Sequence, residues 1–302
     1  MSNTTEKTSN SLSLIKKEHR NKVLITLFLV TTLAGGGYWA VIAATSSSAP
    51  SVALALRLAY IAVLYMPVPL YTLLLSRFML GIPIPFRALL SLKHITVKKY
   101  ALVAGLFLAW AVLMIGSVAV LGWLWPEMFG HLATTNGHLV HNLEKLIGTS
   151  VDTSAMNMPP TPLAMLPLGI FGALMAGLTV NAIFAMAEEI MWRGYLAQAF
   201  AGRPFCKKYV TIGVLWGLWH IPLIALGYNY GTANALPGSV LFIGFCVVMS
   251  LVLGFVVERT RSVWLAAVLH GTFNGFSQVM LLLVVGGSSL LASSAVGVVS
   301  LV

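Results

Sequence analysis

The chain has 302 residues, of which 58% are hydrophobic and only 9% are charged, and its mean hydropathy is +0.90. Soluble domains carry about 25% charged residues, so this composition excludes an ordinary soluble protein. The apolar runs are continuous rather than alternating, which argues against a transmembrane β-barrel. The sequence therefore predicts an all-α fold, a polytopic bundle of transmembrane helices.

The chain is basic, with 18 Lys and Arg residues against 8 Asp and Glu residues and a formal net charge of +10. Such an excess can indicate nucleic-acid binding, but in a polytopic membrane protein the positive side chains collect in cytoplasmic loops. We therefore expect membrane lipid, and no nucleic acid, as the partner of these charges. The cysteines, Cys206 and Cys246, lie far apart and form neither a disulfide framework nor a metal-binding pattern.

The chain divides into a polar, basic cytoplasmic tail, residues 1–22, and a membrane-embedded helical domain, residues 23–302. Apolar segments able to cross a bilayer cover 23–44, 52–76, 100–125, 162–200, 209–228, 238–257 and 263–286. The run 162–200 is too long for one straight span, so we expect its end to project into the cytosol. The last segment, 288–302, is short and rich in Ser and Gly, and predicts either a partial eighth span or a terminal interface helix.

The distribution of Lys and Arg between alternate connections indicates the orientation. If the amino terminus is cytoplasmic, the outer segments hold only Lys145, and the inner segments 1–22, 77–99, 203–208 and 259–261 hold nearly all the others. We therefore expect a multi-pass protein with its amino terminus inside, and favour a bacterial inner membrane over the endoplasmic reticulum. The long outer connection, 126–161, carries leucines at helical spacing, which predicts an amphipathic helix lying on the membrane.

The polar residues inside the apolar segments are the strongest functional signal. A carboxylate at membrane depth costs about 2.5 kcal/mol or more, yet Glu188 and Glu189 stand side by side in such a segment. Counted from the nearest inner-side basic residues at about 1.5 Å per residue, Glu188, His220, His270 and Asn274 lie roughly 13 to 23 Å from the cytosolic boundary. Different helices thus place costly groups at overlapping depths, which predicts that these groups form one site.

Helical spacing assigns these residues different roles. Residues four apart share a helix face, so Glu189 faces Arg193 in the favourable acid-before-base order. Glu188 points about 100° away and needs another partner. We therefore assign Glu188 to chemistry, and Glu189 and Arg193 to supporting the structure and the local field. His270 and Asn274 are also four apart, and two donors on one face can converge on a developing oxyanion.

The spacing of these residues resembles a known family. The matching stretches are Glu188, Glu189 and Arg193 as Glu-Glu-x-x-x-Arg, then Trp216-Gly217-Leu218-Trp219-His220, then His270-Gly271-Thr272-Phe273-Asn274, each in a separate span. Their order over about 185–276 is similar to that of the CPBP family, the CaaX-type and bacteriocin-processing (Abi) intramembrane glutamic proteases. One departure is visible, because the family usually has Phe four residues before the second-motif histidine and this chain has Trp216.

The resemblance implies an endopeptidase that hydrolyses a peptide bond in the membrane without a metal or other cofactor. Glu188, helped by His220, would activate a water, and His270 and Asn274 would stabilise the tetrahedral oxyanion. The family also implies a cavity that opens to the cytosol and a peptide or protein substrate, with prenylated CaaX-type tails among the candidates. Residues 1–160 carry no motif, so the choice of substrate is not transferred.

Other interpretations of the same residues stay open. The carboxylates could form a buried structural ion-pair cluster, and Asn274 could bridge helices. A metal-dependent membrane protease would have only a loose zinc set, because the chain lacks His-Glu-x-x-His. Intramembrane Glu and His can also relay protons in a transporter, and a non-catalytic partner protein could keep the fold. In the outer connection, His138, His141 and Glu144 could share a face as metal ligands, or simply be solvated.

Overall fold

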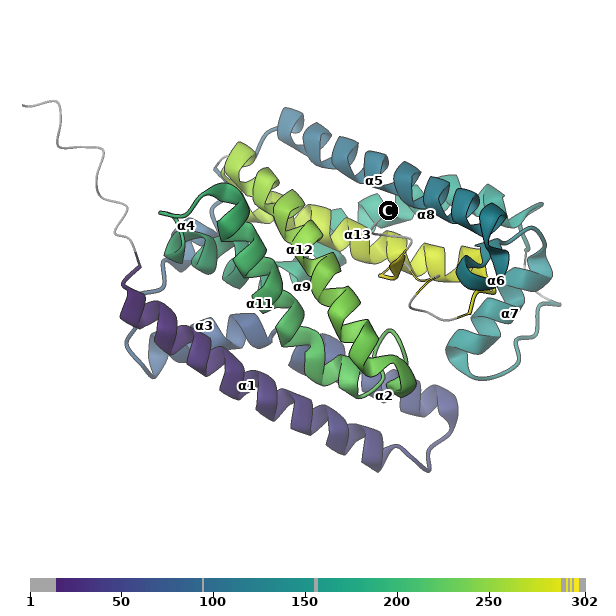
Figure 1. Cartoon of the computed structure of the whole chain (residues 1–302), viewed down its shortest axis with the longest axis horizontal. Coiled ribbons are helices and arrows are strands. Elements are labelled where there is room, and N and C mark those ends of the chain that lie inside the picture. The colour runs from purple at the N-terminus through teal and green to yellow at the C-terminus, as the bar shows by residue number, and fades with distance from the viewer. Residues whose placement is uncertain are drawn as a thin grey trace, which may run out of the picture.

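The computed structural model describes residues 15–93, 95–154, 157–288, 292, 294 and 296–298, and these form a bundle of long helices (Figure 1). Among them, 6 helices are long and apolar enough to cross a membrane, and a bent pair of helices raises the number of possible spans to 7. The spans are Lys17–Ala44, Pro50–Phe78, Val97–Leu124, the pair Pro162–Leu178 and Val180–Ala199, Phe205–Ala225, Thr232–Thr260 and Val263–Leu283. They coincide with the predicted apolar segments, so the all-α polytopic bundle is confirmed.

The chain enters the bundle through a straight helix and a broken one. The elements are α1 (Lys17–Ala44), α2 (Pro50–Tyr60), the π-helix η1 (Ile61–Tyr65), α3 (Val68–Phe78) and the short α4 (Phe86–Leu89). Helix α1 begins before the predicted span because charged residues extend it, with Lys22 and Glu18 paired at 2.6 Å on its exposed surface. Pro67 and Pro69 lack backbone donors, which explains the break between η1 and α3. The tail before residue 15 lies outside the described residues.

The outer connection folds against the end of the last span. It follows α5 (Val97–Leu124) and contains α6 (Pro126–Phe129), the strand β1 (His131–Leu132) and α7 (Asn136–Ile147); β1 pairs antiparallel with β2 (Val284–Val285). Helix α7 is the amphipathic helix predicted here, and it buries Leu139. The Asn142 side-chain amide donates to the carbonyls of Leu282 and Val284, at 2.9 Å each. Helix α7 is therefore hydrogen-bonded to the end of the last span.

The long segment 162–200 is bent within the bundle. It contains the 3₁₀-helix η2 (Pro162–Ala164), α8 (Met165–Leu178), α9 (Val180–Glu189), the π-helix η3 (Ile190–Leu196) and α10 (Ala197–Ala199). The two halves of this span meet at Thr179 with a bend of 55°, so a change of direction takes up the length that we expected to project. The bend brings α9 close to Gly271 of the last span, where a Cβ atom would lie 2.7 Å from the Asn181 backbone.

The last spans form the centre of the bundle. They are α11 (Phe205–Ala225), the 3₁₀-helix η4 (Thr232–Asn234), α12 (Ala235–Thr260) and α13 (Val263–Leu283). Helices α11 and α12 pack closely because Gly217 has no side chain. A Cβ atom at this position would lie only 2.7 Å from the Cα atom of Ile243. Helix α13 packs against α5, α8, α9 and α12 (Figure 1), and is buried from Leu265 to Phe273. Segment 288–302 falls largely outside the described residues.

Candidate active site

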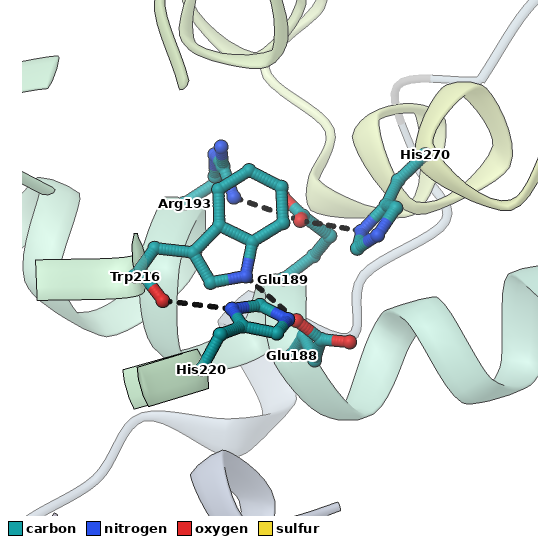
Figure 2. Close-up of polar contacts among 6 residues, drawn as sticks. All are labelled: Glu188, Glu189, Arg193, Trp216, His220 and His270. Carbon is teal, nitrogen blue, oxygen red and sulfur yellow. Dashed lines mark hydrogen bonds and ion pairs between the residues drawn. The ribbon is translucent and has the colours of Figure 1, made fainter. Parts of the chain in front are cut away.

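Glu188 and Glu189 are the last residues of α9, directly before the π-helix η3. A π turn changes which face of a helix each side chain occupies, and such turns are frequent at functional sites. Glu188 is 4% exposed and Glu189 is 0% exposed. Buried carboxylates need partners, and Figure 2 shows that the two have different ones.

Glu189 is bound by the guanidinium of Arg193 and the imidazole of His270. Its Oε1 atom accepts hydrogen bonds from Arg193 at 2.8 Å and from Nδ1 of His270 at 3.0 Å. The side chains of Glu189 and Arg193 are both fully buried. The predicted ion pair between Glu189 and Arg193 is therefore confirmed. In addition, His270 joins it from α13, so this carboxylate ties two segments of the bundle together.

Glu188 is bound instead by the indole of Trp216 on α11. The Nε1 atom of Trp216 donates to Oε2 of Glu188 at 2.8 Å. The same indole ring also faces Arg193, whose guanidinium carbon lies 4.3 Å from the ring centroid. Arg193 forms its ion pair with Glu189, and no ion pair reaches Glu188 within the described part of the chain. Glu188 is thus the carboxylate that is not neutralised by a cation.

His220 lies one turn after Trp216, and its hydrogen bond determines which ring nitrogen can take a proton. Its Nδ1 atom is 2.9 Å from the carbonyl oxygen of Trp216. A carbonyl can only accept, so Nδ1 carries the proton and Nε2 of the neutral ring is left as an acceptor. The ring packs against Trp219 and Phe242, at centroid distances of 4.4 and 4.5 Å. Figure 2 shows that His220 and Glu188 both meet Trp216, the imidazole through the Trp216 carbonyl and the carboxylate through the indole N–H.

His270 and Asn274 share a face of α13, as their spacing predicted, but their surroundings differ. His270 is 5% exposed and is fixed by Glu189. Asn274 is exposed and makes no side-chain hydrogen bond to any other described residue. Because Nδ1 of His270 donates to a carboxylate, its Nε2 atom becomes a donor only when the ring is protonated. Of the two expected oxyanion donors, His270 is therefore fixed by a hydrogen bond, whereas the Asn274 side chain is not.

The exposure around the site is uneven. On the side of the basic turn at Arg259 and Arg261, every residue of η3 is buried, as is α13 from Leu265 to His270. Asn274 lies beyond His270 along α13, farther from that turn, and is exposed. The opening toward the cytosol that the resemblance implies stays a prediction.

Tyr65 reaches the site from the first half of the chain, where no motif points to it. It is the last residue of η1 and is fully buried. Its hydroxyl donates to the Trp219 carbonyl at 2.8 Å, across a separation of 154 residues, and the two rings lie 5.4 Å apart. Trp219 directly precedes His220, so Tyr65 supports the backbone beside that ring. The only signal in the sequence is an aromatic residue just before Pro67, which does not identify the partner.

The histidines of the outer connection belong to a separate region. The rings of His131 and His138 lie 5.7 Å apart, and Oε1 of Glu144 accepts a hydrogen bond from the Val151 N–H at 3.0 Å. In the residues that the structure describes, no group of three or more His, Cys, Asp or Glu side chains is arranged to hold a metal ion. Glu144 therefore has a structural partner in its own loop.

Comparison with known proteins places the site inside a matched region. Residues 163–276 match a family model described as type II CAAX prenyl endopeptidase Rce1-like. The chain is also 28% identical over 95 residues to a CAAX prenyl protease 2 of Methanococcus maripaludis, an alignment that covers 30% of this chain and 35% of the relative. The chain thus spans about a third of the length of that curated relative. Glu188, His220, His270 and Asn274 all lie within residues 163–276.

Proposed function

We propose that this chain, whose residues 163–276 belong to the CPBP family of CaaX-type proteases, is an intramembrane endopeptidase of the metal-independent glutamic type. It hydrolyses a peptide bond with water activated by Glu188 and His220, and stabilises the oxyanion with His270 and Asn274. The observation that carries this proposal is the unequal treatment of adjacent carboxylates. Glu189 is neutralised by its ion pair, whereas Glu188 meets a single indole N–H and remains available as a base.

The attacking water lies between Glu188 and His220 in this mechanism. Oε2 of Glu188 is occupied by Trp216, so Oε1 is the oxygen left to accept from the water. Nε2 of His220 is the second acceptor, because Nδ1 is held by a carbonyl. As the water oxygen attacks the peptide carbonyl carbon, its proton passes to this pair. The same proton then moves to the leaving amine nitrogen when the C–N bond breaks.

The oxyanion is stabilised from α13. Asn274 donates from its side-chain amide once substrate is present, since that amide has no competing partner among the described residues. His270 donates from Nε2 in its protonated form, and the neighbouring carboxylate of Glu189 balances the charge of that ring. Loss of one oxyanion donor lowers kcat by about 10²–10³-fold in well-studied proteases.

The substrate is a peptide or protein presented at the membrane. The matched family and the relative are described as CAAX prenyl proteases, so a tail with a prenylated cysteine is the first substrate class that we propose. The multi-pass helices place the protein in a membrane, and we propose the bacterial inner membrane with the amino terminus in the cytoplasm. No cofactor takes part.

A reconstituted peptidase assay tests the proposal. Purified protein in lipid vesicles is given a quenched fluorogenic peptide that ends in farnesylated cysteine and three further residues, and the same peptide without the farnesyl group. We expect Glu188→Gln, which keeps the shape and removes the base, to lower cleavage at least about 100-fold. Glu127→Gln makes the same change on an exposed residue of the outer connection and should cleave normally. Normal cleavage by Glu188→Gln would show that the assigned base is wrong.

Chelation separates the glutamic mechanism from a metal-dependent one. We expect EDTA and 1,10-phenanthroline to leave cleavage unchanged. Activity that is lost on chelation and restored by zinc would favour the metalloprotease instead. If wild-type protein cleaves neither peptide, a comparison of peptides in cells with wild-type and Glu188→Gln protein identifies a substrate that accumulates uncut. Equal peptide patterns in those cells would count against an endopeptidase.

A further inference from the structure

Trp216 contacts Glu188, Arg193 and both histidines of the site. Its indole nitrogen meets Glu188 at 2.8 Å, its carbonyl meets His220 at 2.9 Å, and its ring lies 4.3 Å from the Arg193 guanidinium carbon and 5.2 Å from the centroid of the His270 ring. Phe, which the CPBP family usually has at this position, could provide the carbonyl and an aromatic face. It could not provide the N–H, so the contact with Glu188 is a feature of this chain.

We propose that the indole N–H of Trp216 positions the Glu188 carboxylate for water activation. Trp216 is a positioning residue here, since it acts through Glu188 and does not touch the reacting atoms. The inference rests on the proposed peptidase function, because it assigns a role within the same site.

The N–H restricts Glu188 in two ways. It uses one lone pair of Oε2, so Oε1, which accepts no hydrogen bond from the described residues, is the oxygen more open to the water. It also fixes the plane of the carboxylate, because a hydrogen bond to an ionised group is short and directional. A base that is held in one orientation needs no reorganisation when the water attacks.

The same contact keeps Glu188 apart from Arg193. The Nε and NH2 atoms of Arg193 are buried and have no hydrogen-bond partner among the described residues. They could therefore donate to a second carboxylate. With Trp216 in place, the guanidinium lies over the indole ring while the N–H of that ring holds Glu188. We infer that removing the N–H allows Glu188 to turn toward Arg193, which would convert the base into a second ion pair.

A structural role for Trp216 would depend on the volume of its ring, whereas this role depends on one N–H. Replacement of Trp216 by 3-benzothienylalanine, through nonsense suppression, exchanges the N–H for sulfur and keeps the ring shape. We expect kcat for the farnesylated peptide to fall about 10- to 100-fold, the range for a hydrogen bond to a charged group, with KM within about twofold. Trp216→Phe should show a similar loss.

Trp192→Phe is the matched control for the phenylalanine variant. Trp192 is buried on η3, and its indole nitrogen has no hydrogen-bond partner among the described residues. Its substitution makes the same change of volume without removing a hydrogen bond, and kcat should stay within about threefold. A benzothienyl variant with wild-type kcat would overturn the proposal and leave Trp216 as a packing residue.

A thermal-unfolding cycle tests the contact without any substrate. Glu188→Met leaves the buried indole N–H without its acceptor, and Trp216→Phe removes the N–H that holds Glu188, so each lowers Tm. We expect the double variant to unfold at a higher temperature than the sum of the two shifts predicts, since neither group is then left unpaired. Additive shifts would refute the hydrogen bond even if the peptidase assay succeeds. Conversely, equal peptide patterns in cells with wild-type and Glu188→Gln protein, together with a non-additive cycle, would overturn the proposed function and retain the contact.

Discussion

Removal of the Arg193 side chain tests the buried charge cluster most directly. Arg193→Met keeps an unbranched apolar chain and leaves Glu189 with His270 as its remaining partner. Removing one partner of a buried ion pair costs about 3–5 kcal/mol, because the other charge stays buried without compensation. The retained His270 bond argues for the lower end of that range. At about 2 °C per kcal/mol for a large chain, we expect Tm to fall by roughly 6–8 °C.

The measurement is thermal unfolding of detergent-solubilised protein, followed by intrinsic fluorescence. Arg203→Met is the control, since Arg203 is partly exposed and contacts Thr211 at 3.3 Å and the Phe200 ring at 4.4 Å, and it should shift Tm by less than about 2 °C. The double variant Arg193→Met/Glu189→Gln should recover at least half of the loss, because it removes the uncompensated charge. A loss below about 2 °C for Arg193→Met, or a double variant that is less stable than the sum of its parts, would refute this account of the cluster.

Further predictions concern the support of the site and its oxyanion donor. Tyr65→Phe should lower kcat a few-fold and stability by about 1 kcal/mol in denaturant unfolding, whereas Tyr71→Phe, which removes an exposed hydroxyl bond of 2.7 Å, should do neither. Asn274→Ala should lower kcat about 10²–10³-fold at unchanged Tm, and a kcat within threefold of wild type would remove it from the oxyanion site. Gly271→Ala should destabilise by several °C, because a Cβ atom there would lie 2.7 Å from backbone; Gly172→Ala, with open space within 4 Å, should be neutral or stabilising.

Much of the candidate site could be predicted because its signals are local. The ion pair of Glu189 and Arg193 follows from a spacing of four within one helix, and the structure confirms it at 2.8 Å. The shared face of His270 and Asn274 follows from the same rule. The exposure of Asn274 does not, because burial depends on which helices pack around α13.

The bend at Thr179 shows a limit of hydropathy. An apolar run of this length predicts only that one span is too short for it. The 55° change of direction is accompanied by the close approach of α9 to α13 at Gly271, a contact between segments about 90 residues apart. The sequence therefore indicated the excess length, and the packing of the two helices determined what the chain does with it.

The apolar spans and the costly polar residues within them follow from the sequence alone, because hydrophobic length and the cost of a buried charge are properties of short segments. The direction of the spans across the bilayer stays a prediction from the distribution of Lys and Arg. The partners of those residues were decided only by the tertiary structure. Glu188 meets Trp216, His270 meets Glu189 and Tyr65 meets the Trp219 carbonyl across different helices. Hydrogen bonds of this kind depend on the rotation and spacing of packed helices to a fraction of an ångström, which no single segment specifies.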